Sequence, residues 1–266
     1  MRLSRKYVIA TFMAVVAAAG VAAPAIADEL AVGKYVALGD SYASGLGAGD
    51  YGDSGGCKRS ANAAPVLWAN SHSPGAFEFA ACSGAVTDDV LNGQLAAVTP
   101  DTELVSIAIG GNDAGFADVM TDCNLGSDDS CVSRNQEAQA FAQSELPGRL
   151  ANVYSAISAA APDAQVIVLG YPHIYQLEGE CSVGLSETKR AAINQSADVL
   201  ADVTAAAASA AGFTFVDART LFAGHEICAD GERWLHSVTF PIEESYHPTT
   251  GGQSGGYLAG LNSVTG

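Results

Sequence analysis

The chain has 266 residues, of which 29 are acidic and 12 are basic, so its formal charge is −17 at pH 7. Such an acidic protein repels phosphate backbones at long range, which argues against nucleic acid as a partner. The length suffices for the core of one α/β domain, and no segment beyond the N-terminus is long and apolar enough to cross a bilayer.

The N-terminus has the pattern of a secretory signal peptide. Three basic residues stand among the first six, an apolar run extends from Tyr7 to Ala23, and the small residues of Ala25-Ile26-Ala27 follow. A membrane anchor is the rival interpretation, but the run is short for a span and the small residues come at once. We therefore expect residues 1–27 to be removed. The secreted, extracellular chain of residues 28–266 then has a formal charge of −20 and no stable membrane anchor.

Beyond the signal peptide, short apolar runs alternate with longer helical segments. Five runs are predicted to be strands: Tyr35–Leu38, Phe77–Ala81, Leu104–Ile109, Gln165–Leu169 and Phe213–Val216. Helices are expected around 135–160, a stretch that contains Pro147, and over 186–211. Strands that precede helices are typical of a parallel sheet covered on both faces, and no linker divides residues 28–266. The sequence therefore predicts a single α/β domain.

The first predicted strand runs into Gly39-Asp40-Ser41-Tyr42. In an open parallel sheet, ligands bind beyond the carboxyl ends of the strands. A serine at such a strand-to-helix turn lies near backbone N–H groups that favour negative charge, which suits a nucleophile whose attack creates an oxyanion. Taken alone, the segment also fits a plain turn whose serine caps a helix.

Two further strands end in segments suited to stabilising an oxyanion. The second is followed by Cys82-Ser83-Gly84-Ala85, where Gly84 can present a bare backbone N–H. The third ends in Gly110-Gly111-Asn112-Asp113, where Asn112 offers two amide donors. A loop followed by a helix cap is the alternative for each segment. Because all three segments follow strands, they fall on the same edge of a parallel sheet, and this coincidence favours one shared site.

His247, in Glu244-Ser245-Tyr246-His247-Pro248, is the candidate base for a serine nucleophile, because histidine titrates near neutrality. The other four histidines lack this context and are expected to be structural or surface residues: His72, His173, His225 and His236. Of these, His173 and His236 stay open as residues that line a substrate groove.

Six cysteines lie beyond the expected cleavage site: Cys57, Cys82, Cys123, Cys131, Cys181 and Cys228. Export places them in an oxidising compartment, so three disulfides are expected. The sequence alone allows about 15 ways of pairing the six cysteines. The cysteines are widely spread and include no C-x-x-C pair, which argues against a zinc cluster. We expect no metal site.

Together these segments resemble the SGNH hydrolases, the esterase and lipase family also called GDSL. The family's first motif matches Gly39-Asp40-Ser41, its second Gly84, its third Gly110-x-Asn112-Asp113 and its last His247, in the family's order. The resemblance implies a flavodoxin-like, three-layer α/β/α fold with a mostly parallel five-stranded sheet. It also implies that Ser41 is the nucleophile. The oxyanion hole would consist of the Ser41 and Gly84 backbone N–H groups and the Asn112 side chain.

A closer resemblance is to the secreted actinobacterial lipases, phospholipases and esterases of this family. It implies three sequential disulfides: Cys57–Cys82, Cys123–Cys131 and Cys181–Cys228. The first of these would tie the loop after the nucleophile to the residue two before Gly84.

At one position this chain departs from the common family pattern. Many members carry Asp three residues before the histidine, where this chain has Glu244. Glu244 is one candidate for orienting His247, as a triad acid. The alternative, which we favour because it is found in the close secreted relatives, is that His247 Nδ1–H donates to the backbone carbonyl of Ser245. Either partner leaves Nε2 free to act as the base.

The expected function is a secreted carboxylic ester hydrolase, an esterase or lipase, that forms an acyl-enzyme and needs no cofactor. Its partner would be a small-molecule or lipid ester, and we expect a monomer. Two alternatives share the same motif residues, an acetyl esterase acting on polysaccharides and a phospholipase. A non-catalytic binding protein on the same scaffold is disfavoured because every catalytic position is chemically competent.

Overall fold

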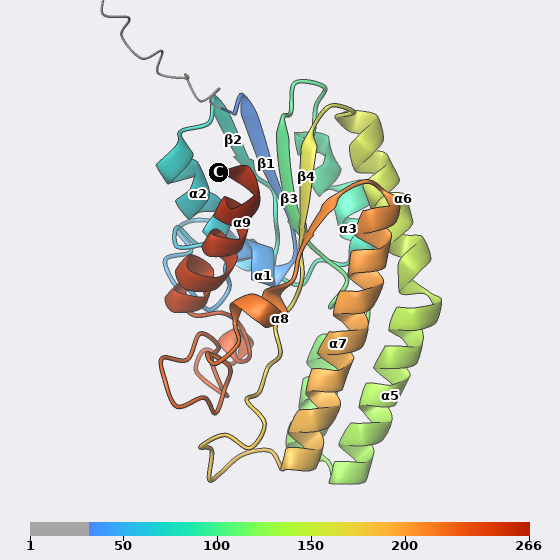
Figure 1. Cartoon of the computed structure of the whole chain (residues 1–266), viewed down its shortest axis with the longest axis vertical. Coiled ribbons are helices and arrows are strands. Elements are labelled where there is room, and N and C mark those ends of the chain that lie inside the picture. Colours follow the sequence, from blue (N-terminus) through green and yellow to red (C-terminus); the bar gives the residue numbers. More distant parts are fainter. Residues whose placement is uncertain (1–31) are drawn as a thin grey trace, which may run out of the picture. The chain divides into compact units, whose positions relative to one another are not determined.

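The computed structural model describes residues 32–266, so the signal peptide expected over 1–27 lies outside the described residues. One five-stranded sheet organises the described chain (Figure 1). Its strands are β1 (Lys34–Gly39), β2 (Ala76–Phe79), β3 (Leu104–Ala108), β4 (Gln165–Leu169) and β5 (Thr214–Val216). Their order is β2-β1-β3-β4-β5 and every pairing is parallel. The sheet is thus wholly parallel where a mostly parallel one was expected.

Strand β1 shows why the sheet is covered on both faces. Its side chains alternate, so Tyr35 and Ala37 pack into one hydrophobic core while Val36 and Leu38 pack into the other. All four are fully buried. A strand buried on both sides has a continuous apolar sequence, which is why the strand runs were visible in the sequence.

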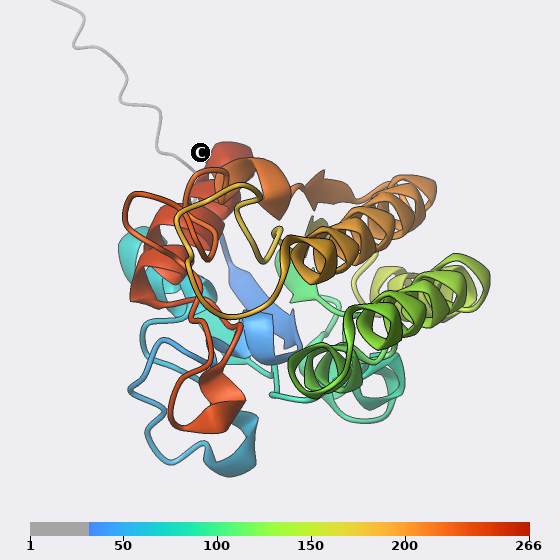
Figure 2. The ribbon, with the colours of Figure 1, turned by 90° about the horizontal axis from the view of Figure 1, so that it is seen from below.

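Helices flank the sheet in two layers. They are α1 (Ser41–Ser44), α2 (Ala64–His72), α3 (Thr87–Asn92), α4 (Phe116–Leu125), α5 (Asp128–Ser144), α6 (Leu146–Ala160), α7 (Glu187–Ala210), α8 (Ala218–Leu221) and α9 (Leu258–Thr265). Helices α2 and α9 cover one face, whereas α3, α6 and α7 pack on the other, as the end-on view in Figure 2 shows. None of the helices within residues 32–266 is long and apolar enough to cross a membrane.

The helix expected around 135–160 is in fact two helices, α5 and α6, separated at Glu145. Pro147 is the second residue of α6, where its missing N–H and fixed φ are tolerated. The helix expected over 186–211 corresponds to α7. Ser186 caps it by accepting a hydrogen bond from the Lys189 backbone N–H.

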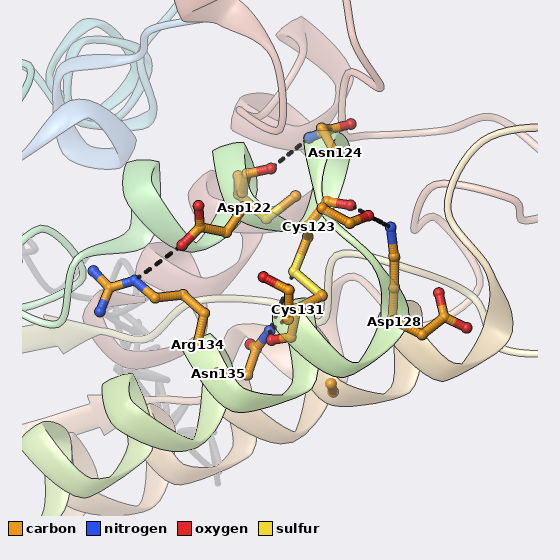
Figure 3. The surroundings of a disulfide bond; sticks show 12 residues. Asp122, Cys123, Asn124, Asp128, Cys131, Arg134 and Asn135 are labelled. Carbon is orange, nitrogen blue, oxygen red and sulfur yellow. Dashed lines mark hydrogen bonds and ion pairs between the residues drawn. A yellow bond between two sulfur atoms is a disulfide. The ribbon is translucent and has the colours of Figure 1, made fainter.

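Three disulfides join Cys57 to Cys82, Cys123 to Cys131 and Cys181 to Cys228. This is the pairing that the closer resemblance implies. The Cys123–Cys131 bridge ties the end of α4 to the start of α5 (Figure 3). Beside it, the Asn135 side-chain amide donates to the Cys131 carbonyl at 2.8 Å, within α5.

Candidate active site

The turn after β1 places Ser41 at the carboxyl edge of the sheet. Gly39 has φ +125°, and a Cβ there would lie 2.3 Å from the Ala108 carbonyl oxygen, so only glycine lets β1 lie this close to β3. Asp40 then caps α1 by accepting the Tyr42 backbone N–H at 2.9 Å. Ser41 is the first residue of this helix, so its backbone N–H has no intrahelical acceptor.

His247 meets Ser41 directly. The distance from His247 Nε2 to Ser41 Oγ is 2.8 Å, and His247 Nδ1 lies 2.9 Å from the Ser245 carbonyl oxygen. Because a carbonyl can only accept, Nδ1 carries the ring proton and Nε2 accepts the hydroxyl hydrogen. Burial lowers the pKa of His247 to about 4, although the hydrogen bond to Ser245 acts in the opposite direction. The ring is therefore neutral at pH 7.

Glu244 points to a different partner. Its Oε1 accepts the Tyr51 hydroxyl at 2.6 Å, and the same hydroxyl accepts the Gly47 backbone N–H. Glu244 thus joins the loop after the nucleophile to the segment that carries His247. Of the two residues considered for orienting the ring, the carbonyl of Ser245 is the one at hydrogen-bond distance from Nδ1.

The other two expected segments lie beside Ser41 and are linked to each other. Gly84 has φ +81°, a Cβ there would meet nothing within 4 Å, and its N–H has no acceptor among residues 32–266. The Asn112 amide donates one hydrogen to the Ala85 carbonyl at 3.0 Å, which leaves its second N–H available. Asp113 accepts both the backbone N–H and the hydroxyl of Thr87. These two hydrogen bonds tie the segment after β3 to the first residue of α3.

Asp40 and Tyr171 form a buried pair that sequence reasoning missed. The Tyr171 hydroxyl donates to Asp40 Oδ2 at 2.5 Å and accepts the Gly111 N–H at 3.3 Å. Burial raises the pKa of Asp40 to about 7, and hydrogen bonds from Tyr171 and Tyr42 oppose this shift. Both carboxyl oxygens have partners other than His247, so Asp40 holds the turn that carries Ser41.

A mostly apolar pocket of about 710 Å³, counted with its open mouth, extends from Ser41 and Asn112 between α4, α5 and α7. Its helical lining consists mainly of apolar residues: Phe116, Val119 and Met120 of α4, Ala138 and Ala142 of α5, and Ile193, Ala197 and Leu200 of α7. These apolar residues recur three or four positions apart, a spacing that in the sequence predicts a helix face buried in the hydrophobic core. For this reason the pocket was not predicted.

The remaining four histidines do not line this pocket, although the His236 backbone is hydrogen-bonded to those of Tyr246 and His247. His173 is hydrogen-bonded to a surface aspartate and His236 to a backbone carbonyl. Neither lines the pocket beside Ser41, so the groove-lining role left open for them does not apply to this pocket. His72 and His225 each stack on a tryptophan ring. Within the described chain, no group of three or more His, Cys, Asp or Glu side chains is placed to hold a metal ion.

The sheet is parallel, and its carboxyl edge presents a buried serine–histidine pair together with unpaired N–H donors. This architecture is typical of a class of serine hydrolases. The model of the GDSL-like lipase/acylhydrolase family matches residues 37–254. The chain is 55% identical to a lipase from Streptomyces rimosus over 100% of both chains.

Two solved structures are similar. A phospholipase A1 from Streptomyces albidoflavus is 56% identical with a TM-score of 0.85, covering 88% of this chain and 99% of that one. An extracellular lipase from Streptomyces rimosus is 58% identical with a TM-score of 0.85, covering 87% and 99%. The chain therefore belongs to the GDSL-like lipase/acylhydrolase family and is a carboxylic ester hydrolase. The predicted family, fold class and enzyme class are confirmed.

Proposed function

We propose that Ser41 is the nucleophile of this ester hydrolase and His247 its general base. The observation that carries the proposal is the 2.8 Å hydrogen bond between Ser41 Oγ and His247 Nε2, in a tautomer set by the Ser245 carbonyl. A nucleophile within reach of a base that is itself oriented by a third group is the arrangement that activates a serine.

The reaction proceeds through an acyl-enzyme. The Ser41 hydroxyl attacks the ester carbonyl carbon while His247 Nε2 takes its proton, and the imidazolium returns that proton to the leaving alcohol. Water then attacks the acyl-enzyme by the same two steps and releases the acid. Because the pKa of His247 is about 4, the ring is fully available as a base at neutral pH.

The oxyanion of each tetrahedral intermediate accepts from three donors, the backbone N–H groups of Ser41 and Gly84 and the free N–H of the Asn112 amide. The unpaired state of the two backbone groups and the fixed position of Asn112 support this assignment. Loss of one such donor typically lowers turnover by about 10²–10³. Asn112→Ala is the variant that removes one without touching the backbone.

The substrate class follows from the pocket beside Ser41. Its apolar lining, contributed by residues of α4, α5 and α7, suits an acyl chain. A lipid ester is therefore favoured over an acetylated polysaccharide. Phospholipid is a second candidate, favoured by the 56% identity to the phospholipase A1 from Streptomyces albidoflavus.

The enzyme acts outside the cell as a monomer. Three disulfides support folding in an oxidising compartment, and the similar Streptomyces rimosus structure is that of an extracellular lipase. Light scattering of the purified protein tests the oligomeric state, and fractionation of the producing culture tests export.

The central test compares Ser41→Ala, His247→Ala and the double variant on a soluble ester. Each single variant should lose at least about 10⁴ of the turnover, and the double variant should be little worse because the two residues act as a unit. Circular dichroism checks that the variants fold, and a covalent phosphonate probe should label only chains with Ser41. Near-wild-type turnover in a folded single variant removes that residue from the mechanism.

A substrate panel then separates the lipid candidates. Acetyl esters, long-chain esters, phospholipids and acetylated xylan are compared by kcat/KM. The pocket predicts that long-chain esters or phospholipids exceed acetyl esters. A clear preference for acetylated xylan would refute the proposed substrate class and leave the Ser41–His247 assignment intact.

A further inference from the structure

The segment that carries His247 needs tertiary contacts to hold its shape. Residues 245–247 belong to no helix or strand. Tyr246, directly before His247, has φ +67°, a left-handed conformation that residues other than glycine rarely adopt. Such a conformation persists only where surrounding contacts stabilise it. The peptide between Tyr246 and His247 sets the position of the His247 Cα atom. The contacts that hold this peptide therefore also set the position of the imidazole ring.

One of these contacts comes from the residue next to the nucleophile. The Tyr42 hydroxyl donates to the Tyr246 carbonyl oxygen at 2.6 Å. No other donor within residues 32–266 reaches that carbonyl. The centroid of the Tyr42 ring also lies 5.2 Å from that of the His247 ring. A single side chain, covalently attached beside Ser41, therefore contacts both the backbone and the ring of the segment that carries the base.

Tyr42 is itself held firmly. Its side chain is buried, and its ring packs edge-on against Tyr171, Phe116 and Tyr257. Its own carbonyl accepts from the Gln253 amide at 3.1 Å. Burial raises the pKa of the Tyr42 hydroxyl well above its ordinary value, so the hydroxyl keeps its proton and stays a donor.

We propose that Tyr42 is a positioning residue, whose hydroxyl fixes the Tyr246–His247 peptide so that His247 Nε2 meets Ser41 Oγ. The inference rests on the proposed function, since it requires His247 to be the base. The Tyr42 hydroxyl is engaged by the carbonyl and acts on the reaction only through His247. It adds a link from the segment of Ser41 to the backbone hydrogen bonds that His236 makes with Tyr246 and His247.

The test is Tyr42→Phe, which keeps the packed ring and removes only the hydrogen bond. We expect kcat on a soluble ester to fall about 10- to 100-fold with KM within about two-fold, because a displacement of about 1 Å at a reacting group can cost 10²-fold. The rate of phosphonate labelling at Ser41 should fall by the same factor. In NMR spectra the His247 Nδ1 proton should broaden as the ring gains mobility.

Two matched variants separate positioning from structure. Tyr257→Phe removes another buried bond from a tyrosine hydroxyl to a carbonyl, here that of Gly170 at 2.9 Å. It should lower the melting temperature with kcat close to wild type. Tyr154→Phe removes a buried hydroxyl that has no partner, so it should leave kcat unchanged and should not lower the melting temperature.

Each outcome decides between the two proposals. If Ser41→Ala or His247→Ala stays active, the proposed function fails, whatever Tyr42 does. If those variants are inactive while Tyr42→Phe keeps wild-type kcat and labelling rate, only the positioning role is overturned. If Tyr42→Phe lowers the melting temperature but leaves kcat unchanged, as expected for Tyr257→Phe, the positioning role of Tyr42 is likewise overturned.

Discussion

The partner of His247 Nδ1 is an uncharged carbonyl, and this choice shapes the chemistry of the site. A carboxylate at this place would raise the pKa of the ring, whereas the Ser245 carbonyl compensates burial only in part, so the pKa is about 4. The carbonyl still sets the tautomer that leaves Nε2 as the acceptor. The site thus orients its base through the backbone and uses the nearby carboxylate of Glu244 elsewhere.

The first prediction concerns Glu244. Glu244→Gln should keep activity within a few-fold, because Glu244 binds Tyr51 and not the ring, and an amide oxygen can still accept that hydroxyl. The comparable acid-to-amide change in a serine protease triad lowers turnover by about 10⁴. Steady-state kinetics of the variant distinguish the two cases. Tyr51→Phe is the companion variant: it removes the hydrogen bond that Gln can keep, and also the acceptor of the Gly47 N–H, and it should likewise be mild because neither group contacts the ring. A thousand-fold loss in folded Glu244→Gln would establish it as a triad acid.

The pH dependence of kcat/KM gives a second prediction. The pKa of His247 in the folded enzyme is about 4, below the usual value of about 6.5, so the base stays deprotonated well into acid. The acid limb of the profile should therefore lie below pH 5.5. Between about pH 6.5 and 4 the unfolded chain binds the additional proton, so this histidine makes folding less favourable as the pH falls.

Asp40 provides the control for that profile. Burial raises its pKa to about 7, so it titrates near neutrality. If kcat/KM changes near pH 7 in the wild type but not in Asp40→Asn, the change is due to titration of the Asp40 carboxyl. A limb near pH 6.5 that persists in Asp40→Asn would contradict the lowered pKa of His247.

Three helices build the proposed substrate pocket: α4 and α5, which are consecutive in the chain, and α7. Helices α5 and α7 lie side by side, and each presents residues spaced three or four apart to the pocket, while α4 closes its side. Small side chains such as Ala138, Ala142 and Ala197 leave the space that an acyl chain would occupy. The pocket therefore depends on both the composition of these helices and the bridge that ties α4 to α5.

Filling the pocket should change the preferred acyl length. In Ala197→Phe the larger ring occupies space beside Ser196 and Leu200, so kcat/KM for long-chain esters should fall at least about 10-fold while acetyl esters change little. Ala206→Phe, on the exposed side of α7, is the control and should leave the profile unchanged. An equal loss for short and long esters would mean that the acyl chain binds elsewhere.

The Cys123–Cys131 bridge closes a short loop, with a sequence separation of 8. Its removal in a Cys123→Ala, Cys131→Ala double variant should lower the free energy of unfolding by about 2.5 kcal/mol according to the chain-entropy relation. Urea titration measures this loss. Because the bridge joins two walls of the pocket, activity on long-chain esters should decline more than activity on acetyl esters. A stable variant with an unaltered chain-length profile would show that α4 and α5 keep their places without it.

At the scale of the whole molecule, the proposed catalytic groups converge because their segments share one edge of a parallel sheet. The turns after β1, β2 and β3 contribute Ser41, Gly84 and Asn112, and the segment after β5 returns His247 to the same edge. The acidic composition should weaken adsorption to anionic lipid surfaces at low salt.

Export gives the final prediction. Cleavage after Ala27 should leave Asp28 as the N-terminus, because Ala25 and Ala27 supply the small residues that signal peptidase requires. Intact-mass measurement of protein from the culture medium checks this directly. Replacing Ala27 by a bulky residue such as Trp should abolish or shift the cleavage. Cell-bound protein that retains residues 1–27 would indicate a membrane anchor instead.

Much of the fold and site could be predicted because the information is local. The runs that form β1, β3 and β4 are continuous and apolar, and the serine, glycine and asparagine of the motifs lie within five residues of a strand end. The division of 135–160 into two helices was missed because Pro147 is equally compatible with a kink and a new first turn. Helix α4 was missed because it follows Gly115 in a left-handed conformation and has no side-chain cap.

The family, the parallel α/β class and the four motif positions could be derived from the amino-acid sequence, since each depends on neighbouring residues and on their order along the chain. The three-dimensional structure was needed to show that Nδ1 of His247 meets the Ser245 carbonyl while Glu244 meets Tyr51. It alone revealed the pocket and the contact from Tyr42 to Tyr246, whose partners lie 204 positions apart. Such contacts depend on how distant segments pack, and no local pattern in the chain records which side chain reaches which carbonyl.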